Sequence, residues 1–181
     1  MSEGRGSKGG MGHIVTSTVL VTLLFTGAMF GFFFAWVSST MWGLDQADPA
    51  VAIRAMQAMN ASVRNSVFGT VFFGTPVVLA LALLLLVFDR QKKPSLWLGA
   101  GLGLYLSGVL AVTVAINVPL NEGLAATRLS DDPSGNAAIW IAYSAPWQQA
   151  NLVRTLAGGL ALLCCAIAFQ HLGRRKDIHR A

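Results

Sequence analysis

The chain has 181 residues, of which 54% are hydrophobic and only 12% are charged, and its formal net charge is +5. A soluble domain with so few charged residues would be hard to keep in solution, so the composition favours a membrane protein. The pI near 9.8 follows from an uneven division of basic residues along the chain, and no nucleic-acid surface is needed to explain it.

Four long apolar runs predict four membrane-spanning helices, at residues 14–37, 66–88, 96–118 and 151–172. Each run exceeds about 20 residues, which at a rise of about 1.5 Å per residue crosses a hydrocarbon core of about 30 Å. The second run also lacks the polar stripe that a water-soluble helix would carry. The sequence therefore predicts an all-α integral membrane four-helix bundle with outer helical loops, formed by residues 14–172.

The two ends of the chain are predicted to be tails. Residues 1–13 are rich in Gly and Ser, which is typical of a disordered segment, and residues 173–181 are strongly basic. The first apolar run is longer than the roughly 7–15 residues of a cleaved secretory signal, so we expect it to remain as an anchor.

The basic residues also predict the orientation. Nine of the thirteen lie in residues 1–13, 89–95 and 173–181, at one side of the predicted bundle. Cytoplasmic segments of membrane proteins are enriched in Lys and Arg, so we expect both termini to lie in the cytoplasm, with the protein in the plasma (inner) membrane.

Two longer segments, 38–65 and 119–150, then face outward. Asp48 followed by Pro49 is typical of a helix start, with Asp as the N-cap and Pro in the first turn. This predicts an outer helix that leads into the second span. Residues 129–136, with Asp, Pro, Ser and Gly, read as a loop.

Prolines suggest where two of the spans end or begin. Pro119, in Asn117-Val-Pro-Leu-Asn121, is expected to end the third span, because proline lacks an N–H and disfavours helical geometry in the preceding residue. Ser144 is expected to cap the last helix, with Pro146 in its first turn.

Polar side chains and tryptophans gather near the outer ends of the spans. They are Asn60, Arg64, Asn65, Asn117, Asn121, Asn151 and Arg154, with Trp36, Trp42, Trp140 and Trp147 at the same level. An interfacial aromatic belt with snorkelling arginines is the alternative to a site. Arg154 lies two turns inside the last helix beside small residues that suit close packing, so we expect it to be buried and functional, whereas Asn151 could serve only as an interhelical hydrogen bond.

Three of these elements together resemble the anthrone-oxygenase-like family of small four-helix membrane proteins. They are Asn117-Val-Pro-Leu-Asn121, Trp147-x-x-x-Asn151-x-x-Arg154 and Met56-Gln-x-x-Asn60, and the resemblance covers residues 15–169. It implies oxidation of an anthrone to an anthraquinone with dioxygen and no known cofactor. Many members of the family are described only as a domain of unknown function.

Such chemistry would need donors for an oxyanion, because an anthrone reacts with dioxygen once it has lost a proton and its carbonyl oxygen gathers negative charge. The candidate catalytic residues are Arg154, Asn151, Arg64 and Glu122, and the candidate substrate-binding residues are Asn117, Asn121, Trp147, Trp140 and Asn60. Glu122 is the preferred base, with Asp45, Asp48, Asp131 and Asp132 as other outer carboxylates. His13, His171 and His179 fall on the opposite side of the membrane.

Other chemistries find little support. No outer cluster of His, Cys and carboxylate shows metal-ligand spacing, and Cys164 and Cys165 read as packing residues. The glycines of residues 99–103 follow no strand and suit helix packing better than phosphate binding. Neither inverted halves nor a polar stripe through the whole membrane is visible, which argues against a transporter or channel.

Two functions therefore remain open. The first is a membrane-embedded oxygenase that acts, without a cofactor, on a lipophilic aromatic or enolisable molecule. The second is a non-catalytic membrane subunit or a lipid- or quinone-binding protein that uses the same polar residues. The expected partners are the bilayer, a lipophilic small molecule, and a second copy or another membrane protein.

Overall fold

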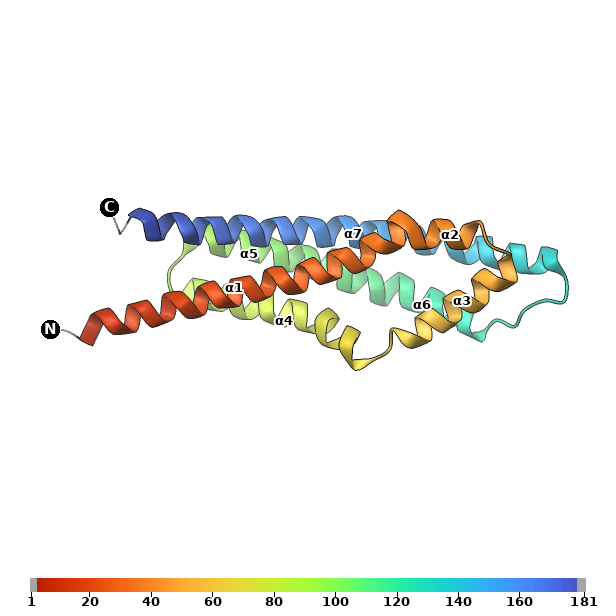
Figure 1. The fold of residues 1–181 in the computed structure, drawn as a ribbon, viewed down its shortest axis with the longest axis horizontal. Coiled ribbons are helices and arrows are strands. Elements are labelled where there is room, and N and C mark those ends of the chain that lie inside the picture. The colour runs from red at the N-terminus through yellow and green to blue at the C-terminus, as the bar shows by residue number, and fades with distance from the viewer. Residues whose placement is uncertain (1–2, 179–181) are drawn as a thin grey trace.

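The computed structural model describes residues 3–178, which contain helices and no strand. In chain order the elements are α1 (Glu3–Ala35), the π-helical turn η1 (Trp36–Thr40), α2 (Met41–Asp45), α3 (Pro49–Ser62), α4 (Ser66–Phe88), α5 (Lys92–Leu104), the π-helical turns η2 (Tyr105–Ala111) and η3 (Thr113–Asn117), α6 (Val118–Ala126) and α7 (Pro133–Ile178). Figure 1 shows them as one elongated bundle.

Four continuous helical stretches are long and apolar enough to cross a membrane, namely Gly12–Asp45, Ser66–Phe88, Lys92–Ala126 and Pro133–Gly173. Many of their large apolar side chains point away from the bundle, as Leu24 and Phe88 do at 69% and 78% exposure. Such side chains suit contact with lipid. The predicted all-α bundle of four membrane-spanning helices is thus confirmed, and the chain is an integral membrane protein.

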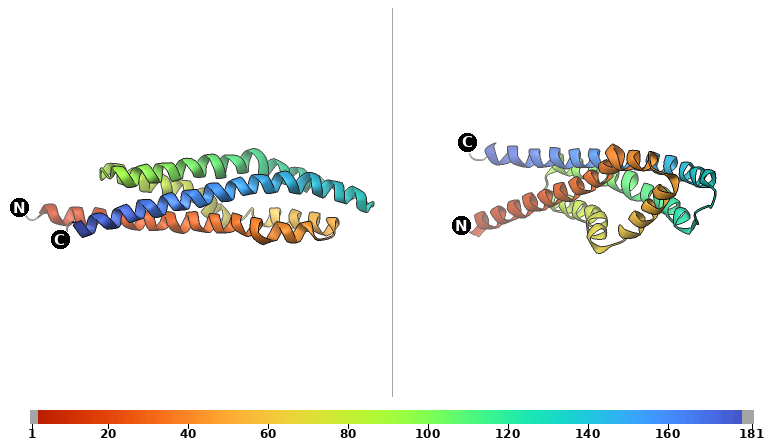
Figure 2. Two further views of the ribbon diagram at one scale, coloured as in Figure 1. Left: turned by 90° about the horizontal axis from the view of Figure 1, so that it is seen from above. Right: turned by 45° about the vertical axis from the view of Figure 1, so that its right-hand side comes forward.

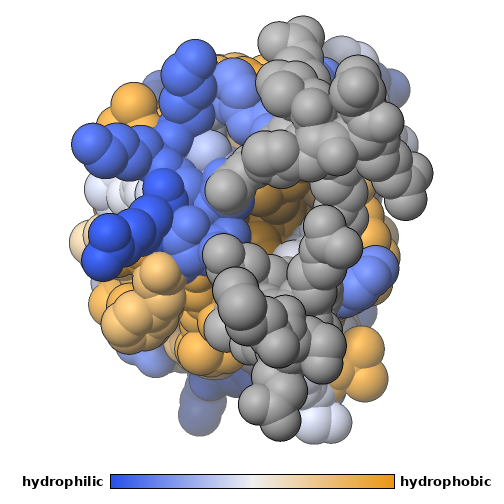
Figure 3. All heavy atoms as spheres, turned by 90° about the vertical axis from the view of Figure 1, so that its left-hand side faces the viewer, coloured by the Kyte–Doolittle hydropathy of each residue, from blue (hydrophilic) through white to orange (hydrophobic). Residues whose placement is uncertain are grey.

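The four spans pack as an antiparallel ring. α1 packs against α4 and α7, and α5 packs against the same two helices, so each span touches the next in sequence and the last touches the first. Figure 2 shows the long α1 and α7 side by side. Both described ends of the chain lie at one end of the bundle, where hydrophilic residues gather (Figure 3). Arg90 in the turn between α4 and α5, and Lys92 and Lys93 at the start of α5, lie in a cluster with His171.

Small residues bring α5 and η2 close to α7. A Cβ added to Gly101 would lie 3.3 Å from the Ala161 carbonyl oxygen, and one added to Gly108 would overlap the Ala157 Cβ. Helices in a membrane depend on such close backbone approach, because lipid chains are as apolar as their side chains.

The helices at the two ends extend further than the sequence predicts. α1 already begins at Glu3, within the segment expected to be a disordered tail, and α7 continues to Ile178. Adding residues to an existing helix is far easier than starting one, so neighbouring residues can join a long span without apolar character of their own.

The prediction that Pro119 ends the third span was wrong. The helix continues from Lys92 through Pro119 to Ala126, with π-helical turns immediately before the proline, and Pro119 lies in the first turn of α6. In the first turn of a helical segment the missing N–H of proline costs nothing.

These wide turns also keep one face of the third span inward. The inward residues recur every fourth position, at Tyr105, Val109, Thr113, Asn117 and Asn121. In a regular α-helix, steps of four residues would drift by about 40° each, whereas π-helical turns hold more residues per turn and reduce the drift.

The last helix begins well before Ser144, its predicted N-cap, and within the segment 129–136 that was predicted to be a loop. α7 starts at Pro133, and the Asp132 carboxylate accepts a hydrogen bond from the Ser134 N–H at 3.1 Å. Hydrogen bonds from the Ser134 hydroxyl and backbone hold the pKa of Asp132 below its usual range. Ser144 therefore does not cap the helix, and Pro146 lies inside it.

The helix α3, which lies at the end of the bundle opposite the two chain ends, begins as predicted. This end is termed the outer end and the opposite one the inner end, as labels for the two ends of the bundle only. The Asp48 side chain accepts hydrogen bonds from the N–H groups of Ala50 and Val51, and Pro49 is the first helical residue. Gln57 donates to the carbonyl oxygens of Leu124 and Thr127, at 2.8 and 3.1 Å. These bonds fix α3 to the end of α6 and place Asn60 over the outer half of the bundle.

Candidate functional site

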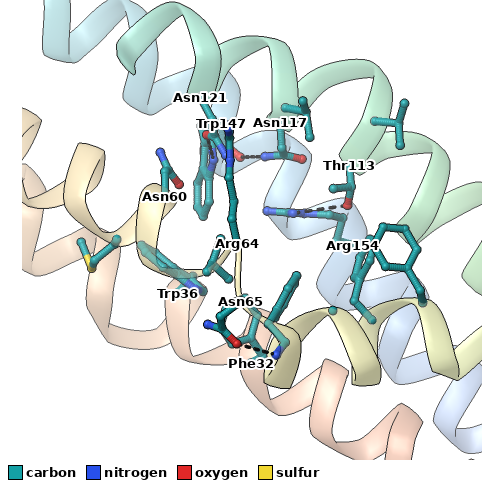
Figure 4. A pocket seen from close by; sticks show the side chains of 18 residues that line it. Phe32, Trp36, Asn60, Arg64, Asn65, Thr113, Asn117, Asn121, Trp147 and Arg154 are labelled. Carbon is teal, nitrogen blue, oxygen red and sulfur yellow. Dashed lines mark hydrogen bonds between the residues drawn. The ribbon is translucent and has the colours of Figure 1, made fainter. Parts of the chain in front are cut away.

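A cavity of about 390 Å³ lies in the outer half of the bundle, below α3 and between α4 and η3 (Figure 4). Its aromatic lining residues are Phe32, Trp36, Phe68, Phe72, Phe73 and Trp147, and its polar ones are Asn60, Arg64, Asn65, Thr113, Asn117, Asn121 and Arg154. The volume falls within the range of small-molecule sites, about 300–1,000 Å³. An apolar wall with a few polar groups is typical of such sites.

The cavity exists because the outer part of α4 does not follow the third span. α4 packs along α1 and α5 and touches η2 through Tyr105, but its backbone does not run beside η3 or α6. Pro76 lies inside α4, and a proline within a helix removes one backbone hydrogen bond and bends it. Gly69, on the cavity wall, has open space beyond it.

Arg154 lies at the base of the cavity and is 6% exposed. One terminal nitrogen donates to the Asn151 side-chain oxygen at 2.9 Å, and the other donates to the Thr113 hydroxyl at 3.4 Å. The guanidinium carbon lies 4.7 Å from the Phe33 ring centre and 5.3 Å from that of Trp147. The Nε group has no hydrogen-bond partner among the described residues.

Arg154 therefore keeps its charge inside the bundle largely through aromatic rings and neutral oxygens. Rings attract a cation through their negative faces, and this attraction is stronger where water is excluded. A buried charge that lacks an opposite charge is costly, and a ligand oxygen that accepts from the Nε group would lower that cost.

Asn117, beside Arg154 in Figure 4, is the second incompletely satisfied group. It is 1% exposed and donates to the Trp147 carbonyl oxygen at 3.4 Å. Its side-chain oxygen has no partner among the described residues. The cavity is thus bordered by a donor on Arg154 and an acceptor on Asn117 that have no partner among the described residues. Both atoms are covered in this structure, so a ligand with an oxygen acceptor and a hydroxyl would reach them after a small movement of the surrounding side chains.

Asn60, Asn121 and Trp147 are joined by Tyr143. The Asn60 amide donates to the Tyr143 hydroxyl at 3.2 Å, and that hydroxyl donates to the Asn121 side-chain oxygen at 2.8 Å. The Trp147 indole N–H donates to the same oxygen at 2.9 Å. These bonds fix the polar wall between α3, α6 and α7.

Arg64 and Asn65 line the cavity where the turn between α3 and α4 meets the outer surface. Both are exposed, and in Figure 4 the Arg64 side chain extends across the cavity toward the level of Asn121. The Arg64 side chain makes no hydrogen bond or ion pair with the described residues. Its guanidinium is available to water or to a ligand.

Three predicted site residues do not line the cavity. Asn151 supports it from behind, because its amide donates to the Phe33 carbonyl oxygen at 3.1 Å and its oxygen accepts from Arg154. Trp140 donates to Asp45 at 2.9 Å, outside the cavity. Glu122 is exposed on α6 and does not line the cavity either.

Sequence reasoning missed Thr113, Phe33, Tyr143 and the structural role of Asp45. The Asp45 carboxylate accepts from the Trp140 indole, the Ser144 hydroxyl at 2.7 Å and the Gln148 amide at 2.8 Å, which joins α2 to α7. Only Thr113 has a signal in the sequence, since it lies four residues before Asn117 on the repeat of inward positions.

No carboxylate or histidine is among the described residues that line the cavity, whose titratable side chains are Arg64 and Arg154. Within the described part of the chain, no three His, Cys, Asp or Glu side chains gather where they could hold a metal ion. Cys164 and Cys165 are buried and free, away from the cavity.

The fold and the cavity define a class of protein, a four-helix membrane bundle with a buried arginine in an aromatic pocket. The family model described as Anthrone oxygenase matches residues 64–164, which is more than half of the chain. The protein therefore belongs to the anthrone oxygenase family, as its sequence motifs predict. No curated protein and no solved structure matches the chain.

Proposed function

We propose that this membrane protein is an oxygenase that oxidises a lipophilic, enolisable aromatic molecule of the anthrone type with dioxygen. The observation that supports this most directly is the buried Arg154 beside Asn117 at the wall of an aromatic cavity, with one donor and one acceptor that have no partner among the described residues. The family to which the chain belongs supports the same chemistry.

The reaction would begin with loss of a proton from the methylene group of the substrate. The charge left behind spreads onto the carbonyl oxygen, where Arg154 can stabilise it with a charge-assisted hydrogen bond. Dioxygen then oxidises the carbanion, so that the methylene carbon exchanges its two hydrogens for one oxygen atom. The other oxygen atom leaves as water, which balances the reaction.

The aromatic wall would hold the flat rings of the substrate. Phe68 and Phe72 are nearly parallel, with ring centres 5.3 Å apart, and Trp36 lies 5.1 Å from Trp147. Such rings bind a polycyclic ligand by burial of apolar surface and by stacking. The substrate carbonyl would then lie toward Arg154, and a neighbouring hydroxyl could donate to Asn117.

The lining residues suggest that water, rather than a side chain, accepts the proton. Arg64 and Arg154 are the titratable groups that line the cavity, and neither is a suitable base when charged. The positive charge of Arg154 would lower the pKa of the bound substrate, and water at the Arg64 rim could carry the proton away.

A non-catalytic binding protein for a quinone or another lipophilic carbonyl compound is the second candidate. The same lack of a carboxylate or histidine in the lining favours it, because binding needs no base. Arg154 and the aromatic wall would serve either function.

The test uses purified protein in lipid nanodiscs with anthrone as the probe. We expect faster formation of anthraquinone than in empty nanodiscs, with label from ¹⁸O₂ in the new carbonyl group, and loss of this activity in Arg154→Lys. Tight binding of anthraquinone without turnover would favour the binding protein. The absence of both binding and turnover would contradict both candidates.

A further inference from the structure

The cavity has two rims that differ in chemistry. Arg64 and Asn65 form a polar rim at the outer surface. Phe73 of α4 and Val114 of η3 also line the cavity, yet they are 62% and 60% exposed on the outside of the bundle. Both lie within apolar spans, so the surface that they expose faces lipid.

We infer that the ligand enters sideways from the bilayer, through an opening between α4 and η3 whose rim is formed by Phe73 and Val114. This inference rests on the proposed function for the identity of the ligand. It adds the membrane as the source of the substrate and two residues that control its access.

The packing of the helices permits such an opening. The backbones of α4 and η3 do not run side by side, so the gap at this level is spanned by side chains alone. Gly69, one turn outward from Phe73 on α4, leaves open space on the cavity wall. Small side-chain movements of Phe73 or Val114 would therefore widen the opening while α1 and α5 still hold α4.

The chemistry of the ligand favours the same route. A polycyclic aromatic compound is far more concentrated in the bilayer than in water, and an opening within the hydrocarbon region spares it transfer through water. The polar rim suits other species, because Arg64 is charged and extends across that side of the cavity. Protons and water can use the outer rim while the apolar substrate uses the lateral opening.

The opening is tested through rates, with 1,8-dihydroxyanthraquinone as the probe and protein in nanodiscs. Val114→Trp narrows the rim and should slow association and dissociation alike, by at least fivefold, while the Kd changes less than twofold. Phe73→Ala widens the rim and should speed both rates. A rim residue changes the barrier in both directions, whereas a residue that binds the ligand changes the Kd.

Matched controls lie on the same helical stretches. Leu106→Trp introduces the same side chain at a position that is 41% exposed and does not line the cavity, and Phe88→Ala removes a ring at the inner end of α4. Both should keep wild-type rates. Wild-type rates in Val114→Trp and Phe73→Ala, combined with a changed rate in Arg64→Ala, would overturn the lateral route and leave the proposed function intact.

A second measurement tests the lateral opening without 1,8-dihydroxyanthraquinone. A phospholipid with a diazirine on its acyl chain should label the buried cavity residues Phe72 or Trp147 in the wild type, and less so in Val114→Trp. Labelling of the cavity by the lipid, together with no binding of 1,8-dihydroxyanthraquinone, would support the opening and contradict the proposed ligand class. Labelling confined to outward residues such as Leu81 and Leu84 would overturn the opening.

Discussion

The Tyr105 hydroxyl donates a hydrogen bond to the Phe72 carbonyl oxygen at a distance of 2.8 Å, and both side chains are buried. In an α-helix this carbonyl would accept from the N–H four residues later, but that residue is Pro76, which has none. Tyr105 thus supplies from the third span the donor that α4 lacks. The bond lies next to the cavity, at the level where the outer part of α4 leaves the third span.

The first prediction concerns this bond. Tyr105→Phe should lower the free energy of unfolding by about 1 kcal/mol, because it leaves a buried carbonyl oxygen without a donor. The measurement is equilibrium unfolding in mixed micelles. In a Pro76→Ala background the restored N–H can bond the Phe72 carbonyl oxygen, so the same Tyr105→Phe change should cost clearly less. Equal costs in the two backgrounds would show that the bond does not compensate for the proline.

The second prediction concerns Arg154. Arg154→Lys should insert and fold as the wild type does, yet weaken binding of 1,8-dihydroxyanthraquinone at least tenfold, because lysine keeps the charge but loses the planar fork and the stacking on Phe33 and Trp147. Fluorescence titration at equal amounts of folded protein measures this. Arg54→Lys, at an exposed position of α3, is the control. Unchanged binding in Arg154→Lys would mean that the arginine only anchors the helix.

The third prediction concerns the proton acceptor. The rate of anthrone oxidation should rise with pH up to the pKa of the bound substrate, because only the ionised substrate reacts with dioxygen. With more acidic anthrones, the midpoint of the pH profile should move down by a similar amount. Glu122→Gln should leave the profile unchanged, since this side chain lies outside the cavity. A midpoint that stays fixed for all substrates would instead indicate a protein base.

The fourth prediction concerns orientation, which the division of basic residues predicts and the fold leaves open. A reporter fused after Ala181 should be cytoplasmic, and one inserted after Leu129, in the loop between α6 and α7, should be external. Alkaline phosphatase and green fluorescent protein fusions distinguish the two sides. If the reporters at the two positions lie on the same side of the membrane, the bundle of four spans is contradicted.

Much of the fold could be predicted because hydropathy reports membrane crossing directly, and the second span was located residue for residue at Ser66–Phe88. The ends of the other spans were harder. The rule that proline ends a helix considers only α-helical geometry, whereas the third span passes Pro119 after two π-helical turns. The N-cap rule failed at Ser144 because α7 has already begun at Pro133, so the N–H groups that Ser144 would cap are bonded within the helix.

The candidate site was predictable where a polar residue in an apolar helix has no alternative to the interior. Asn117, Asn121, Arg154, Asn60, Arg64 and Trp147 all line the cavity. Asn151 and Trp140 do not line the cavity. Helical periodicity shows which residues share a face of a helix, but it does not show which neighbouring helix that face contacts. Tyr143 could not be found from the sequence, since its partner Asn60 lies 83 residues away in the chain.

The fourfold repeat of inward residues in the third span makes chain length part of the site. Substitution at an outward position such as Leu106 or Ile116, which are 41% and 42% exposed, alters mainly the contact with lipid. Loss or gain of a single residue there acts differently, because each residue turns the helix by about 100°. Everything beyond the change would swing around the helix axis, which would carry Asn117 out of the cavity while the inner half stayed in place. The spacing between these residues is therefore under as strong a physical constraint as their chemical identity.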